Sequence, residues 1–305
     1  MPIVLTGHLL CATPAEAERV ERHLPAHLAA TRAEPGCLAF HVRPTADPLA
    51  WQVDEVFADE SAFAAHQARM AQSTWARATA GIERRYVTRD GVPPVLGEPR
   101  RPSPLGGRRP RADDLRRFAA DDPRAMDDVL PVAPETLRML IVGVNPGLWT
   151  AAVNAPFARP GNRFWPSLQR AGLTDRVVDA STGLSGEDEQ QLLVRGIGIT
   201  NLVGRATARA DELSRDELRE GGRRVVAQVA RLRPRVVAVA GITAFRAAFS
   251  LPKARLGAQD PPLARGWPDG VALWVVPQPS GLNAHETTDS LASKWREVWA
   301  AAARA

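Results

Sequence analysis

Three continuous apolar runs in the second half of the chain constrain its fold most. They cover Leu137–Val144, Arg235–Ala240 and Val271–Val276, and each has the length of a strand buried on both faces of a parallel sheet. Helical patterns separate and follow them, at Asn162–Ala171, Ser214 to about Leu232, Ile242–Phe249 and Glu286–Ala303. This alternation predicts an α/β sheet with helices on both faces, a three-layer α/β/α domain.

The first 90 residues follow a different pattern. Strand-like runs stand at residues 2–10, Cys37–Val42, Trp51–Phe57 and Ile82–Thr88, with helical patterns at Pro14–Ala33 and Asp59–Ala71. The order βαββαβ predicts an α+β, ferredoxin-like domain ahead of the α/β domain. We therefore divide the chain into residues 1–90, a linker over 91–125, and residues 126–305.

The predicted linker is rich in proline, glycine and arginine and has no periodicity. Such composition is typical of an exposed, extended tether. Its arginines, Arg100, Arg101, Arg108, Arg109 and Arg111, either contact DNA phosphates or only keep the tether solvated.

Composition is compatible with a nucleic-acid partner but does not establish one. The 305 residues carry a net charge of +5, which suits a polyanion such as DNA but is also common in proteins that bind none. The cysteines, Cys11 and Cys37, are too few for a four-thiolate site, so we expect neither a metal nor a cofactor. No apolar run reaches the ~18–20 residues of a membrane helix, and no basic region precedes the first one. The expected location is the cytoplasm.

Ligands bind α/β sheets beyond the carboxyl ends of the strands, which here are two loops beginning at Val144 and Pro277. In the first, Gly143–Leu148, rigid and flexible residues surround Asn145, a neutral amide that can accept from water and donate to a substrate. Read alone, this loop is equally well a simple turn. The second loop, Pro277–His285, has an apolar side chain between glycine and small polar residues, which suits insertion into a base stack. Alone, it is an ordinary strand-to-helix connection.

A third segment, Phe157–Trp165, lies between these loops in the sequence. Phe157 offers a flat face for a base, whereas Phe164 and Trp165 are expected in the core. Arg163 is expected to reach a phosphate or a carboxylate.

Together, the three segments resemble the mismatch-specific uracil/thymine DNA glycosylases of the uracil-DNA glycosylase superfamily. The resemblance runs from about Leu130 to the end of the chain. It also includes Gly196–Val203, Ala210–Leu213 and Gly221–Arg224, and the segment Arg109–Leu115 is similar to the leader of actinobacterial members. Gln278 departs from the family, which commonly has asparagine there.

The resemblance implies a role for each site residue. Asn145 would orient the water that attacks C1′ of the sugar. Phe157 would stack on the flipped pyrimidine while backbone groups near Val144 read its edge. Gly147, Asn162 and Ser280 would complete the substrate-binding set, with Ser280 near a phosphate. Gly281, Leu282 and Asn283 would form a wedge that fills the gap in the duplex.

These roles describe a monofunctional glycosylase of base excision repair. A mispaired base is the least costly to extrude, so the expected partner is double-stranded DNA with G:U or G:T mismatches. The three segments contain no lysine, which favours attack by water over a Schiff base.

Residues 1–90 resemble the antibiotic-biosynthesis monooxygenase family. The resemblance is carried by Glu34–Cys37, Trp51-Gln52, Glu55–Phe57, Ser61–Arg69 and Trp75. It implies a ferredoxin-like homodimer, with His41 and His66 as candidate pocket residues. Two alternatives to a glycosylase stay open: a cofactor-independent monooxygenase whose second half is silent or only binds DNA, and a non-catalytic mismatch-binding protein. The first domain is also explained as a dimerisation module.

Overall fold

The computed structural model describes residues 3–45, 47–90, 97–98, 100–119, 122–132, 136–259, 266–281 and 283–304. The chain divides into two compact units, Met1–Pro94 and Val95–Ala305. Among the residues described, no helix is both long enough and apolar enough to cross a bilayer.

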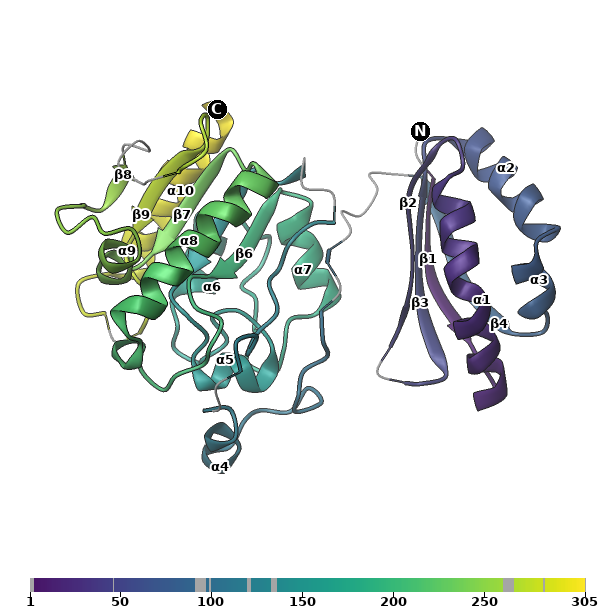
Figure 1. The fold of residues 1–305 in the computed structure, drawn as a ribbon, viewed down its shortest axis with the longest axis horizontal. Coiled ribbons are helices and arrows are strands. Elements are labelled where there is room, and N and C mark those ends of the chain that lie inside the picture. Colours follow the sequence, from purple (N-terminus) through teal and green to yellow (C-terminus); the bar gives the residue numbers. More distant parts are fainter. Residues whose placement is uncertain are drawn as a thin grey trace. The chain divides into compact units, whose positions relative to one another are not determined.

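The first unit is a four-stranded antiparallel sheet with helices packed against it (Figure 1). Its elements are β1 (Ile3–Leu10), α1 (Pro14–Arg32), β2 (Cys37–Pro44), β3 (Ala50–Phe57), α2 (Glu60–Ala71), α3 (Thr74–Ala78) and β4 (Glu83–Asp90). The strand order is β2-β3-β1-β4. Helix α1 begins where the Thr13 side chain accepts a hydrogen bond from the Glu16 backbone, and it buries Val20 and Leu24 in the core. The predicted ferredoxin-like arrangement is confirmed.

The second unit is built around a five-stranded sheet of order β6-β5-β7-β9-β8. Its strands are β5 (Met139–Gly143), β6 (Ile197–Asn201), β7 (Val236–Ala240), β8 (Gly257–Gln259) and β9 (Ala272–Val276). All neighbours are parallel except β8, which pairs antiparallel with β9. The helices are α4 (Ala112–Arg116), α5 (Leu148–Val153), α6 (Phe164–Arg170), α7 (Gly186–Leu193), the short 3₁₀ turn η2 (Ala210–Glu212), α8 (Arg215–Leu232), α9 (Ile242–Ala248) and α10 (Thr288–Arg304).

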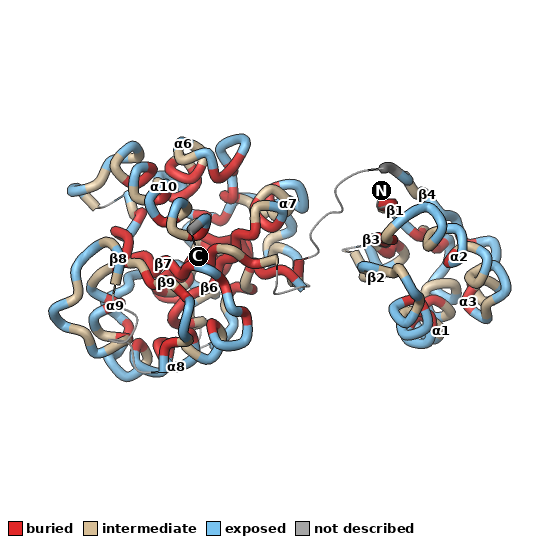
Figure 2. The backbone as a smooth tube through the Cα atoms, turned by 90° about the horizontal axis from the view of Figure 1, so that it is seen from above, coloured by how far each residue is buried: buried red, intermediate tan, exposed pale blue. Residues whose placement is uncertain are grey.

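Helices cover both faces of this sheet, as the alternation of apolar runs predicts. Along β5, Met139 and Ile141 pack into one cluster with α6, α7 and α10, while Leu140 and Val142 pack into the other with α8 and α9. Figure 2 shows the strands as a buried layer with more exposed helices around them. The second unit is thus a three-layer α/β/α domain whose parallel strands bring their carboxyl ends to one edge.

The segment predicted to be an exposed tether differs from that prediction where the structure describes it. Residues from Val95 onward belong to the second unit. Glu98 donates its backbone N–H to Leu130 O (2.7 Å), and Arg109 Nε donates to Ser181 Oγ (3.3 Å). Arg100 donates to the backbone of Asn154. Long-range hydrogen bonds hold this part of the chain, and such bonds leave no local periodicity in a sequence.

Candidate functional site

A cavity of about 570 Å³ lies at the carboxyl ends of the parallel strands in the second unit. It brings together most of the site residues predicted from the sequence: Val144, Asn145, Gly147, Phe157, Asn162, Ser280 and Asn283. Gly281 does not line the cavity but lies against the neighbouring loop, since a Cβ there would be 2.5 Å from Gly161 O. Leu282 lies outside the described residues.

Asn145 is held by a loop that follows a neighbouring strand. Its Nδ2 donates to Thr207 Oγ1 (2.8 Å), Arg205 O (3.0 Å) and Pro146 O (3.1 Å). Because carbonyl oxygens only accept, these bonds fix which end of the amide is the nitrogen. Oδ1 has no hydrogen bond to any residue that the structure describes, so it keeps its capacity to accept from a water.

The backbone on both sides of Asn145 is fixed as well. Leu202 N donates to Gly143 O (2.8 Å), Val203 N to Val144 O (2.9 Å) and Thr207 N to Pro146 O (3.1 Å). The pairing of β5 with β6 therefore continues past the ends of both strands. The turn around Asn145 is an extension of the sheet, which favours a rigid position for the amide.

Phe157 faces the same cavity from the segment before α6. Its ring stacks on the fully buried Phe164 ring, with the centroids 3.8 Å apart and the planes 21° apart. The backbone of Phe157 is left-handed, with φ of 53°, an uncommon conformation for an aromatic residue. Trp165 Nε1 donates to Pro156 O (3.0 Å) and helps to hold this conformation. Phe164 and Trp165 are both buried, as predicted.

Asn201 is a second amide in the cavity, and no role was predicted for it from the sequence. It ends β6 and lies against Gly143, where an added Cβ would be only 2.4 Å from Asn201 Oδ1. Glycine at 143 therefore makes room for this amide. The position of Asn201 at the carboxyl end of a parallel strand is the signal that could have identified it.

Arg163 holds the loop predicted to be a wedge. Its guanidinium donates to the carbonyl oxygens of Ser280 (3.2 Å), Gly281 (3.2 Å) and Asn283 (2.9 Å). In this structure Arg163 therefore holds the loop, and its expected contact with a phosphate or a carboxylate stays a prediction. Gln278 accepts through its backbone carbonyl from Asn283 Nδ2 (3.1 Å), while its side chain is exposed.

Charge in the cavity is confined to a few groups. Among the described residues that line it, the ionisable ones are Arg159, Arg209 and Asp211. Arg209 Nε donates to Asp211 Oδ1 (3.0 Å), and this hydrogen bond lowers the pKa of the Asp211 carboxyl. Arg159 is exposed. No group of three metal-ligating side chains is found in the described part of the chain.

A smaller cavity of about 130 Å³ lies inside the first unit. His27, Glu55, His66, Trp75 and Tyr86 are among its lining residues. The His27 ring stacks on Trp75 with the centroids 4.5 Å apart. His66 Nδ1 lies 2.8 Å from Glu34 Oε2. Of the two predicted candidates, His66 therefore faces this cavity, whereas His41 is not among the described residues that line it.

Two polar atoms around this smaller cavity are buried without a hydrogen-bond partner among the described residues: His27 Nδ1 and Glu55 Oε2. His66 Nε2 lies 3.8 Å from Glu55 Oε2, too far for a hydrogen bond. Burial, reinforced by Glu34 and Asp54, raises the pKa of Glu55 to about 8. Burial, reinforced by Arg69, lowers the pKa of His27 to about 3. Both groups are therefore uncharged near neutral pH.

Comparisons with known proteins separate the two units in the same way. The family model described as antibiotic biosynthesis monooxygenase matches residues 4–78. Among similar solved structures, Rv0793 from Mycobacterium tuberculosis is 17% identical, with a TM-score of 0.26, and the match covers 30% of this chain and 96% of that one. PA3566 from Pseudomonas aeruginosa is 23% identical, with a TM-score of 0.26 and coverage of 30% and 94%.

A second family model matches most of the α/β domain, including all of its parallel strands. It is the model of the uracil DNA glycosylase superfamily, and its match spans residues 130–303, more than half of the 305-residue chain. The chain therefore belongs to the uracil DNA glycosylase superfamily.

Proposed function

We propose that the protein is a monofunctional DNA glycosylase that hydrolyses the N-glycosidic bond of uracil, or thymine, mispaired with guanine. One observation carries the proposal: Asn145 and the ring of Phe157 line the same cavity. Asn145 Oδ1 is unengaged by any described residue, and one face of Phe157 is already covered by Phe164. The amide can orient water while the other face of the ring receives a base.

The cavity suits a base that has left the duplex. A base inside the helix is unreachable, so it must be extruded at a cost of a few kcal/mol, which is lowest for a mispaired base. Stacking against Phe157 offsets part of that cost. The Asn201 amide has one donor and one acceptor group, which complement a carbonyl and the adjacent N–H on the edge of uracil.

Bond cleavage leaves an oxocarbenium-like sugar and an anionic base. Backbone N–H groups near Val144 and Phe157 would stabilise that anion electrostatically. Water held by Asn145 Oδ1 would attack C1′, and because an amide takes up no proton, we expect slow chemistry. No lysine is among the described residues that line the cavity, which favours hydrolysis over a Schiff-base lyase.

The loop held by Arg163 would replace the extruded nucleotide in the duplex. In this proposal Gly281, Leu282 and Asn283 enter the gap, and Ser280 lies near a phosphate. Arg163 fixes the carbonyls of this loop, so little conformational entropy remains to be lost on binding. The exposed Arg159, which lines the cavity, would contact the anionic backbone.

The experiment is single-turnover cleavage of duplexes that carry G:U, G:T or A:U pairs. The protein should release uracil from G:U fastest, and strand breaks should appear only after alkali, because no lyase step follows. Breaks without alkali would contradict the monofunctional assignment. Tight binding to G:U with intact strands at enzyme excess would contradict catalysis and favour a mismatch-binding protein.

A second candidate function rests on the cavity in the first unit. The unpartnered His27 Nδ1 and Glu55 Oε2 favour a small, uncharged, hydroxylated ring as its ligand. Cofactor-independent oxygenation of such a ring is the activity to test, with oxygen uptake by the full-length chain given a monocyclic hydroquinone. Uptake abolished by His27→Ala would support it, and uptake no faster than without protein would contradict it. The homodimer expected through residues 1–90 stays a prediction.

A further inference from the structure

One residue that lines the 570 Å³ cavity, Met126, comes from a segment far from the loops described above. Residues 122–131, here called the strap, pass beside the carboxyl-terminal ends of β6 and α5. Ala125 N donates to Gly204 O (3.1 Å), just after β6. The contact is so close that a Cβ on Gly204 would be 1.8 Å from Pro123 O. At the other side, Asp127 N donates to Asn154 Oδ1 (2.8 Å), at the end of α5.

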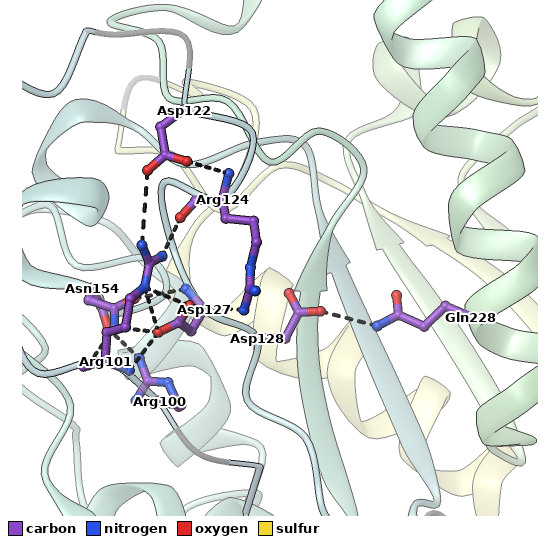
Figure 3. Close-up of polar contacts among 8 residues, drawn as sticks. All are labelled: Arg100, Arg101, Asp122, Arg124, Asp127, Asp128, Asn154 and Gln228. Atoms are coloured by element: carbon purple, nitrogen blue, oxygen red, sulfur yellow. Dashed lines mark hydrogen bonds and ion pairs between the residues drawn. The ribbon is translucent and has the colours of Figure 1, made fainter.

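The carboxylate of Asp127 is the centre of a hydrogen-bonded cluster (Figure 3). It accepts from Arg101 N (2.6 Å), Arg101 Nε (3.0 Å) and Asn154 Nδ2 (3.0 Å), and its residue is only 5% exposed. Although burial opposes ionisation, the hydrogen bonds from Arg101 and Asn154 hold the pKa of Asp127 below its ordinary value. The carboxylate stays charged and keeps all these donors.

Met126 lies between the two anchored residues, and it lines the cavity together with Phe157 and Asn145. It is 6% exposed. Since Ala125 and Asp127 are both fixed by backbone hydrogen bonds, the Met126 side chain can leave the cavity only by changing its own rotamer. A thioether chain with three rotatable bonds fills irregular space beside a flat ring and adapts to its shape.

We propose that Met126 is a specificity-determining residue of the base pocket, and that Asp127 and Asn154 position it. The inference rests on the proposed function, since it concerns which base the cavity accepts. Met126 would limit the size of the substituent that a bound pyrimidine carries. One methylene group more or less on a substrate changes discrimination by an apolar pocket about 10- to 200-fold, and thymine differs from uracil by one methyl group.

The strap also touches the support of Asn145. Gly204, which accepts from Ala125, is followed by Arg205, whose carbonyl accepts from Asn145 Nδ2. A change in the strap can therefore alter rate as well as selectivity, and the two effects need separate readouts. A general loss of activity lowers the rates on thymine and on uracil equally, so it leaves their ratio unchanged. The rate on uracil alone would report both effects together.

The first test is the ratio of single-turnover rates on G:T and G:U duplexes. Met126→Ala should raise the thymine-to-uracil ratio about 10-fold or more, and Met126→Leu should raise it less. Leu256→Ala, an exposed apolar change away from the cavity, serves as control. A Met126→Ala ratio within twofold of wild type, with uracil still released, would overturn the proposal.

The positioning role has its own readout. Asp127→Asn should also raise the thymine-to-uracil rate ratio. In a protein that already carries Met126→Ala, Asp127→Asn should raise this ratio little further. Full additivity of the two shifts would contradict positioning through Met126.

Binding of free uracil and 5-substituted uracils, followed by NMR, separates this inference from the proposed function. If wild type releases no base but Met126→Ala changes the preference among free bases, the glycosylase assignment fails and the role of Met126 stands. If uracil is excised and neither rates nor binding preferences respond to Met126→Ala, the role of Met126 fails and the glycosylase stands.

Discussion

The two cavities of this molecule are built from opposite kinds of chemistry. The cavity of the α/β domain presents neutral amides, Asn145 and Asn201, and its described ionisable groups are two arginines and Asp211. Two groups that line the cavity of the ferredoxin-like domain are kept uncharged by burial. Burial raises the pKa of Glu55 to about 8 and lowers the pKa of His27 to about 3.

This difference separates two ways of making a reactive site. In the α/β domain, sheet hydrogen bonds extend past the strand ends and fix neutral groups in place, so the proposed function would depend on the position of these groups. In the ferredoxin-like domain, the polar groups lie in the interior, so the proposed activity would depend on their protonation state. The rate at the first site should depend little on pH and should fall when one of its side chains is shortened, whereas the rate at the second site should depend strongly on pH.

The largest expected effect is that of Asn145→Ala. Losing the group that orients the water should slow uracil release in single turnover on the order of 10³-fold, with binding to a G:U duplex retained. Gln72→Ala, an exposed amide in the other unit, is the matched control and should react like wild type. A loss below about 5-fold would show that position of this amide does not carry catalysis.

Phe157→Ala comes next. A stacked base is worth about 1–3 kcal/mol to an aromatic side chain, so release should slow about 5- to 150-fold. Phe157→Tyr keeps the ring and should retain most of the rate, while Phe63→Ala in the first unit tests for a general effect of removing an aromatic ring. Equal rates of uracil release for Phe157→Ala and wild type would contradict the proposed site, because release would then not depend on a base stacking on this ring.

Glu55→Gln tests the other cavity through stability. The pKa of Glu55 is about 8 in the folded protein, against an ordinary value of 4.5. The contribution of Glu55 to the free energy of unfolding is therefore full below pH 4.5 and is lost as the pH rises to 8. Between pH 6.5 and 8 the Glu55 carboxyl should therefore remove about 2 kcal/mol of unfolding free energy. The lowered pKa values of His27, His41 and His66 act in the opposite direction over this range, because the unfolded chain still binds protons at these residues. The effect of Glu55 is therefore read as the difference between wild type and Glu55→Gln.

Hydrogen exchange of β1 and β3 amides in the full-length chain measures this loss. Relative to the Glu55→Gln protein, wild type should lose this amount over the same pH range, while the contribution of the three histidines is common to both proteins. An equal slope in both proteins would show that Glu55 does not titrate there.

The smallest expected effect is that of Gln278→Asn, which restores the residue common in the superfamily. Gln278 is exposed although it is among the residues that line the cavity, and the loop is held through its backbone carbonyl and through Arg163. We expect less than about a twofold change in uracil release, which corresponds to less than about 0.5 kcal/mol, the range usual for surface substitutions. A larger change would mean that this side chain contacts DNA.

Much of the fold was predictable because buried parallel strands leave continuous apolar runs. The strand β6 (Ile197–Asn201) was harder to identify from pattern, since Gly198 and Thr200 interrupt its apolar character. Asn201 was missed as a site residue for the same reason. Asn145 and Phe157 were identified because unusual turns and a family resemblance marked them.

The hydrogen-bond partners of Arg163 and of the segment before Leu130 could not be predicted from the sequence. Arg163 donates to loop carbonyls, and Arg101 of the basic, proline-rich segment donates to Asp127; neither partner was predicted from the sequence. Their partners lie 120 and 26 residues away in the sequence. Such pairings depend on the folded domain and leave no local signal.

The most direct test of the central claim is a crystal structure with a G:U duplex whose deoxyuridine carries a 2′-fluorine, which slows cleavage of the glycosidic bond. The account predicts that the extruded uracil stacks on Phe157, with its edge at Asn201 and a water between Asn145 Oδ1 and C1′. A base that remains in the duplex, or one that lies outside this cavity, would contradict it.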